Sequence, residues 1–170
     1  MHREMTDSPP AGARVRVRPA SPDDAAAICG FIQELADYEK EPDAVEATPE
    51  TLRAQMESAA PPFECWIGEL DGAPVGFALT FRTYSTWRAR PGLWLEDFYV
   101  TPAARGAGVG DALFTELARV CVARGYGRLE LTALDWNELA HRFYEKRGMK
   151  RMDEWTTWRI DGAALEALAR

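Results

Sequence analysis

A short glycine-rich run is the first feature of the sequence that could do chemistry. Residues 105–110 read Arg-Gly-Ala-Gly-Val-Gly, directly after an apolar stretch and before an amphipathic one. The backbone N–H groups of such a loop, together with the N-terminus of a following helix, form a binding site for anions. Glycine lets the main chain approach a phosphate closely. The run therefore indicates a phosphate-containing ligand, with a ligand-free turn as the alternative.

Two common nucleotide-binding patterns do not fit this loop. The P-loop pattern GxxxxGK[ST] needs a lysine, and the loop contains none. The dinucleotide fingerprint needs a third glycine or alanine where Asp111 or Leu113 stands. The loop thus matches neither pattern.

Acidic side chains gather between Glu34 and Glu57. Eight acidic residues in this stretch are accompanied only by Lys40 and Arg53, a local balance of −6 in a chain whose net charge is −7. Such a field repels the phosphate backbone of nucleic acids and attracts cations. The stretch therefore favours a cationic ligand over nucleic acid, with a solvated helix face and a polar loop as the alternative.

Neither a disulfide framework nor a metal centre is indicated. Cys29, Cys65 and Cys121 are widely spaced, odd in number and outside any CxxC pattern. His2 and His141 are too few and too far apart to form a metal-ligand cluster. We expect three reduced thiols in the core and no metal.

Alternating strands and helices must position these residues. Apolar periodicity and turn residues predict the order β, α, α, β, β, β, α, β, α, β, α. The expected strands cover 14–18, 63–70, 74–84, 93–100, 128–134 and 155–160, and the expected helices cover 22–41, 49 to about 60, 109–124, 137–147 and a short C-terminal segment. Asp71 and Gly72 predict a hairpin between the second and third strands.

Length and composition fit one globular domain. The chain has 170 residues, of which 46% are hydrophobic, which is enough for one core and too little for two comfortable domains. We predict a disordered tail over 1–13 and a domain over 14–170. No stretch has the apolar length of a signal peptide or a membrane span, so we expect a soluble, cytoplasmic protein with no membrane partner.

The glycine loop and a block downstream of it together resemble the GNAT superfamily of N-acyltransferases. The pattern R-x-x-G-x-G follows a strand that ends in Asp97-Phe98-Tyr99-Val100, like the loop that binds the acetyl-CoA pyrophosphate in that superfamily. The sequences 135–137 (DWN) and 142–148 (RFYEKRG) look like its second conserved block. The resemblance implies an α/β GNAT fold, with a twisted mixed β-sheet, helices on both faces, and a splay near Val100 where acetyl-CoA enters.

Further segments resemble one branch, the spermidine/spermine (diamine) and thialysine N-acetyltransferases. They run from about Arg14 to the C-terminus and include 17–20 (VRPA), 34–39 (ELADYE), 75–78 (VGFA), Tyr84 with Trp87, 95–98 (LEDF), 135–138 (DWNE) and 154–155 (EW). Two features depart from the branch: the turn before Glu154 is one residue shorter than in its vertebrate members, and Thr156-Thr157 precedes Trp158. Both bear on the substrate pocket and leave the exact amine open.

The resemblance also implies a role for each candidate residue. Glu96 receives a proton from the amine through a water, Tyr144 protonates the leaving thiolate, and the backbone N–H near Val100 donates to the carbonyl oxygen. The implied cofactor contacts are Phe98, Tyr99, Val100, Arg105, Gly106, Ala107, Gly108, Val109, Gly110, Asp111, Asn137 and Tyr144. The implied substrate contacts are Tyr38, Glu39, Glu96 and Glu154, together with the strand around 130–132. Asn137 is equally well explained as a helix N-cap.

The predicted activity is transfer of an acetyl group from acetyl-CoA to a small cationic amine, such as a polyamine, a diamine or a thialysine-like compound. Direct attack in a ternary complex is expected, and carboxylates suit such a substrate because they form charge-assisted hydrogen bonds with ammonium groups. The family resemblance also implies a homodimer. Two alternatives stay open: an acetyltransferase of the same fold for a protein N-terminus, a lysine side chain or an antibiotic, and a non-catalytic acyl-CoA-binding sensor.

Overall fold

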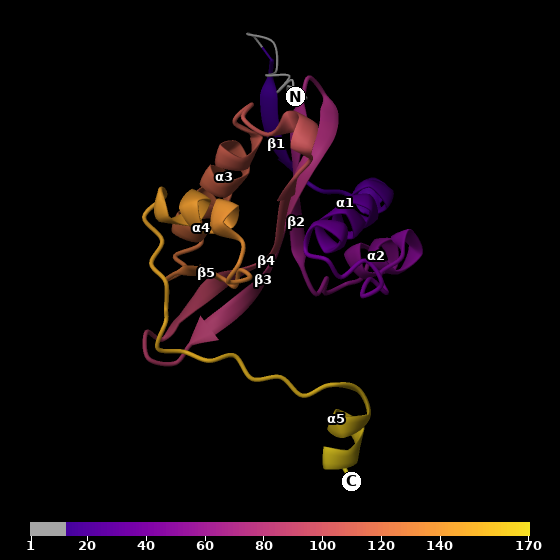
Figure 1. Cartoon of the computed structure of the whole chain (residues 1–170), viewed down its shortest axis with the longest axis vertical. Coiled ribbons are helices and arrows are strands. Elements are labelled where there is room, and N and C mark those ends of the chain that lie inside the picture. Colours follow the sequence, from indigo (N-terminus) through magenta and orange to yellow (C-terminus); the bar gives the residue numbers. More distant parts are fainter. Residues whose placement is uncertain (1–12) are drawn as a thin grey trace, which may run out of the picture. The chain divides into compact units, whose positions relative to one another are not determined.

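The protein is described over residues 13–170 by a computed structural model, in which the chain divides into two units (Figure 1). The first unit ends at Thr132 and the second covers Ala133–Arg170. The expected disordered tail lies outside the described residues except for Ala13. A single domain over 14–170 stays a prediction.

The first unit is built on a five-stranded sheet in the order β1-β2-β3-β4-β5. The strands are β1 (Val15–Pro19), β2 (Glu64–Leu70), β3 (Ala73–Ser85), β4 (Arg90–Val100) and β5 (Leu129–Leu131). The first four are antiparallel neighbours, and β5 lies parallel to β4. This open, mixed sheet confirms the predicted fold class.

Local turn chemistry produces the hairpin between β2 and β3. Asp71 and Gly72 both have a positive φ, of 52° and 84°. Two such residues in succession give the turn whose twist matches that of the flanking strands. The backbone N–H of Arg14 also donates to Asp71 Oδ1 over 2.8 Å, which fixes the start of β1 beside this turn.

Helices cover both faces of the sheet, as predicted (Figure 1). On one face lie α1 (Ala25–Tyr38), which follows the short 3-10 helix η1 (Pro22–Asp24), and α2 (Pro49–Met56). On the other face lies α3 (Val109–Ala123), with Leu113 and Leu117 fully buried. A Cβ on Gly68 would come within 2.6 Å of Val109 Cγ1, so glycine lets α3 approach β2 closely.

Several predicted boundaries shift: α2 ends at Met56 instead of at about residue 60, and β4 begins at Arg90 instead of at residue 93. Helix α1 ends at Tyr38 instead of near Glu41, because Lys40 has a left-handed φ of 66°. The strand expected over 128–134 is limited to Leu129–Leu131, the length over which β5 pairs with β4. Cys65 and Cys121 are buried, as expected of core thiols, and Cys29 is only partly buried.

The second unit contains α4 (Glu138–Glu145) and α5 (Gly162–Leu168). The strand predicted over 155–160 is wrong: the chain from 151 to 160 has no regular secondary structure (Figure 1). A strand needs a neighbour that takes up its backbone hydrogen bonds, and in the described residues the sheet has no member from this unit. Within residues 13–170, none of the helices has the length and apolar character required to cross a membrane.

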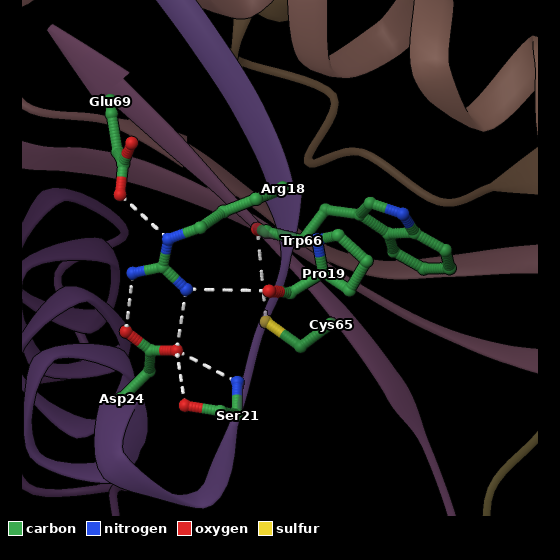
Figure 2. Close-up of polar contacts among 7 residues, drawn as sticks. All are labelled: Arg18, Pro19, Ser21, Asp24, Cys65, Trp66 and Glu69. Carbon is green, nitrogen blue, oxygen red and sulfur yellow. Dashed lines mark hydrogen bonds and ion pairs between the residues drawn. The ribbon is translucent and has the colours of Figure 1, made fainter. Parts of the chain in front are cut away.

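Arg18 joins β1, β2 and the start of α1 through two carboxylates (Figure 2). Its Nε donates to Glu69 over 2.6 Å, and its two terminal nitrogens donate to the two oxygens of Asp24 over 2.7 Å each. Asp24 also accepts from the backbone N–H of Ser21 over 2.7 Å. The hydrogen bond from Arg18 lowers the pKa of Asp24 to about 2. This Arg18 cluster fixes the N-terminal end of α1 against the sheet.

Replacing Arg18 by Met should therefore lower the free energy of unfolding by about 3 kcal/mol, since two largely buried carboxylates would lose their partner. The pKa of Asp24 is lowered on folding, so its contribution is present above its ordinary value and is lost as the pH falls towards 2. Chemical denaturation of the parent between pH 7 and pH 2 should show this loss, and Arg18→Met should show less of it.

Arg53→Met is the matched control, because Arg53 pairs with the exposed carboxylates of Asp23 and Glu57. It should change stability by less than about 1 kcal/mol. Equal losses in the two variants would show that the Arg18 cluster contributes no more than a surface ion pair.

Candidate active site

Strand β4 contains one extra residue at Glu96, and this bulge shapes the site. Leu79 of β3 lies opposite Asp97, whereas the next residue, Thr80, lies opposite Leu95. Glu96 therefore has no residue of β3 opposite it. Neighbouring residues of a regular strand point to opposite faces of the sheet. A bulge places two residues against one and redirects a side chain, and bulges are frequent beside active sites.

The bulge brings both of its acidic side chains towards the face that α1 covers. Asp97 lies opposite Leu79, which belongs to the core beneath α1. Glu96 Oε2 accepts a hydrogen bond of 2.8 Å from Trp94 Nε1, and the Trp94 ring stacks on Phe81 at 6.2 Å between centroids. Two consecutive carboxylates thus share one region.

A third carboxylate comes from the end of α1. Burial, together with the negative charges of Glu96 and Glu39, raises the pKa of Asp97 to about 6. Burial also raises the pKa of Glu39. We call Glu39, Glu96 and Asp97 the acid cluster. Their mutual repulsion would be relieved by a cation, because an opposite charge nearby favours the ionised form of a carboxyl group.

Asp97 was missed as a site residue in the sequence analysis, which assigned the substrate role to Glu39 and Glu96. Two successive acids inside an apolar strand, Leu95-Glu96-Asp97-Phe98, were the available signal. Strand alternation would place one of them on each face. Only the register between β3 and β4 shows the bulge that brings them together.

Strand β4 has an open edge beyond the bulge. β5 lies beside it only from Leu93 to Leu95, so in the part of the chain described no strand follows it towards Val100 on that side. The N–H of Thr101 donates to Val75 over 2.8 Å, in the direction of β3. Because successive N–H groups of a strand point to opposite edges, that of Val100 points to the open one. The expected splay near Val100 is confirmed.

The glycine loop follows this edge after the short 3-10 helix η2 (Pro102–Ala104). Gly106 and Gly108 have φ of 84° and 90°, a conformation that other residues adopt only with strain. A Cβ at either position would meet no atom within 4 Å, so the absent side chains leave open space. Gly108 is the N-cap of α3, whose first N–H groups and positive dipole end suit an anion. The loop therefore fits a pyrophosphate.

Arg105 does not extend freely from this loop. Its Nε donates to the carbonyl oxygen of Val100 over 3.0 Å, and its guanidinium carbon lies 5.5 Å from the ring centre of Tyr38 and 5.7 Å from that of Tyr99. Burial and a hydrogen bond with Glu34 raise the pKa of Tyr99. One predicted substrate residue, Tyr38, and two predicted cofactor residues thus meet at Arg105.

The remaining predicted residues of the first unit lie around the loop or on β5. Phe98 packs edge-on against Phe114 of α3, with ring centres 6.1 Å apart. Asp111 lies in the first turn of α3 and is exposed. Glu130, in the strand that the sequence linked to substrate, is paired with Arg128 over 2.6 Å.

Three predicted residues belong to the second unit. Asn137 is the N-cap of α4 and accepts from the N–H of Ala140 over 3.1 Å, which confirms its capping role. Tyr144 is partly buried on α4 and packs edge-on against Phe143. Glu154 is exposed in the irregular segment from 151 to 160. The structure thus brings the loop, Tyr38 and the acid cluster into one unit, and Asn137 and Tyr144 onto one helix of the other.

Comparisons with known proteins identify the family. The family model for the Acetyltransferase (GNAT) family matches residues 30–149. Thialysine N-epsilon-acetyltransferase of Bos taurus is 36% identical over 168 residues, which cover 92% of this chain and 98% of that protein. Spermidine/spermine N(1)-acetyltransferase-like protein 1 of Homo sapiens is 30% identical over 152 residues, 85% of this chain and 22% of that protein.

A solved structure agrees in fold. An integron cassette protein from the mobile metagenome of V. cholerae superimposes with a TM-score of 0.77 at 23% identity, covering 92% of this chain and 98% of that one. The family match spans most of the chain, including the bulged strand, the glycine loop and α4. The protein is therefore an acetyltransferase enzyme and belongs to the GNAT family.

Proposed function

We propose that the protein transfers the acetyl group of acetyl-CoA to a primary amine of a small cationic substrate, by direct attack in a ternary complex. The observation that carries this proposal is the acid cluster at the β4 bulge, which lies on the same strand that ends at the glycine loop. Relatives named for thialysine and for spermidine/spermine acetylation support an amine with a second charged group.

The acid cluster suits the binding and deprotonation of an amine. An aliphatic amine has a pKa of about 10.4 and is protonated at neutral pH, so it must lose a proton before it can attack. Asp97, with a pKa of about 6, is ionised at neutral pH and can hold the ammonium group together with Glu39. Glu96 is exposed and receives the proton through a water, while Trp94 holds its carboxylate in place.

The loop and the open edge of β4 suit the cofactor. Acetyl-CoA supplies the acetyl group as an activated thioester. Gly106, Gly108 and the first turn of α3 would hold its pyrophosphate, and the N–H of Val100 would donate to the carbonyl oxygen as negative charge develops. We assign the contact with the pantetheine arm to Asn137 and protonation of the leaving thiolate to Tyr144. No metal enters this proposal.

Three expectations that accompany the activity stay predictions. They are the homodimer, the cytoplasmic location and the absence of a nucleic-acid partner.

A panel of amines tests the proposal directly. We expect kcat/KM with acetyl-CoA to be at least about tenfold higher for spermidine, putrescine, thialysine or lysine than for a simple alkylamine of similar length, with a smaller ratio at high salt. Release of free CoA thiol is the measurement. Glu39→Gln should lose much of the preference for diamines over the alkylamine, mainly through a change in KM. Glu50 is an exposed acid of the same stretch, and Glu50→Gln should keep this preference.

Equal kcat/KM values for the alkylamine and the diamines would contradict a binding site for cationic amines. They would not contradict membership of the acetyltransferase family. Preferred acetylation of a protein N-terminus, a protein lysine or an aminoglycoside would identify one of the alternative substrates. CoA release with none of these amines would favour an acyl-CoA sensor.

Asp97→Asn should change stability and activity in opposite directions. The folded state holds the Asp97 proton more tightly than the unfolded chain, so the stability of the parent should fall as the pH rises from about 4 to about 6. The variant lacks this loss and should be more stable at pH 7.5 by up to about 3 kcal/mol. Its kcat/KM for a diamine should fall at least about tenfold, because the ammonium group loses a partner.

The pH profile of kcat/KM provides the second readout. In the parent the value should decline below about pH 6, since this parameter reports the free enzyme, and the decline should be absent in Asp97→Asn. Asp43→Asn, at an exposed position, should change neither stability nor rate appreciably. An unchanged stability in Asp97→Asn would contradict a carboxylate held in a costly environment.

Tyr144→Phe tests the proton donor. The change removes only the hydroxyl group, so kcat should fall by about 10²-fold to 10⁴-fold while the acetyl-CoA affinity stays close to that of the parent. Steady-state kinetics and calorimetry measure the two quantities. Tyr126→Phe, in the loop before β5, is the control and should keep the parent turnover. An unchanged kcat at saturating substrate would remove Tyr144 from the mechanism.

A further inference from the structure

We infer that Arg105 is a positioning residue, which holds the amine-binding end of α1 against β4, and is not a ligand of the cofactor phosphates. The inference rests on the proposed amine site at the acid cluster. It changes the role expected from the sequence, where the first residue of the glycine loop was assigned to the cofactor.

Arg105 is exposed, and its side chain contacts both β4 and α1. Nε donates to the carbonyl of Val100 over 3.0 Å, and the guanidinium carbon lies within 6 Å of two aromatic ring centres, those of Tyr38 and Tyr99. Within about 6 Å an aromatic face attracts a cation, and more strongly where water is excluded. Tyr99 is only 6% exposed whereas Arg105 is exposed, so the buried ring is the fixed side of this contact.

These contacts link the two halves of the proposed site. Tyr38 is the last residue of α1 and directly precedes Glu39 of the acid cluster. Tyr99 follows Asp97 by two positions on β4 and shares its face of the sheet. Arg105 therefore fixes the distance between Glu39 on the helix and Asp97 on the strand. Directly after it, Gly106 turns the chain towards the loop that fits a phosphate.

Charge alone predicts the opposite effect of removing Arg105. A cation close to the acid cluster would repel an ammonium substrate, so its loss would improve amine binding if repulsion were its main effect. A positioning role predicts weaker amine binding, because Glu39 would no longer be held in place. The direction of the change in KM therefore separates the two effects.

The test uses Arg105→Gln and Arg105→Lys in the full chain, with Arg119→Gln as the control. Arg119 lies exposed on α3 and pairs with Glu116. We expect both Arg105 variants to raise the KM for a diamine at least about tenfold, to leave the acetyl-CoA Kd measured by calorimetry within twofold, and to accelerate hydrogen exchange of the backbone amides of residues 35–41. In a double-mutant cycle, Arg105→Gln should add little to the effect of Tyr38→Leu.

A phosphate ligand would give a different pattern. Arg105→Gln would then weaken acetyl-CoA binding tenfold or more, Arg105→Lys would largely restore it, and the KM for the amine would stay unchanged. That result, or a lowered or unchanged KM with unchanged amide exchange, overturns the inference. If the proposed function is wrong, the parent protein will acetylate none of the amines. Hydrogen exchange of the backbone amides needs no substrate, so it tests the Arg105 contact independently of that function.

Discussion

One extra residue in β4 is the constraint on which the site depends. The bulge at Glu96 turns two consecutive carboxylates towards the face covered by α1, while the strand beyond it keeps its pairing with β3. The same strand loses β5 as a neighbour after Leu95, which opens the edge that carries the Val100 N–H. In the proposed function, this single strand would present acidic side chains to the amine on one face and a backbone donor to the acyl group at its edge.

Helix α1 is held to the sheet at both ends by arginine. At its start, Arg18 binds Asp24 and Glu69, and at its end Arg105 contacts Tyr38. Between these points the apolar core around Phe31 and Phe77 supplies most of the burial. Two fixed ends let the helix carry Glu39 into a region where burial and like charges raise the pKa of a carboxyl group.

Local signals account for the parts of the fold that could be predicted. The hairpin at Asp71-Gly72, the start of α2 at Thr48-Pro49 and the glycine loop depend on backbone conformations that a few neighbouring residues decide. Apolar periodicity likewise marks the buried face of α3. Asn137 as a helix cap belongs to the same class, because its hydrogen bond closes within three residues.

The sequence by itself therefore determined the order of the elements up to α4, the glycine turns of the loop over 105–110 and the family to which the chain belongs. Tertiary structure alone decided which face of the sheet Asp97 occupies, the contact between Arg105 and the Tyr38 ring, and the irregular course of residues 151–160. The physical reason is the same in all three cases. Strand register, ring contacts and sheet membership depend on partners far away in the chain, and neither periodicity nor turn chemistry carries that information.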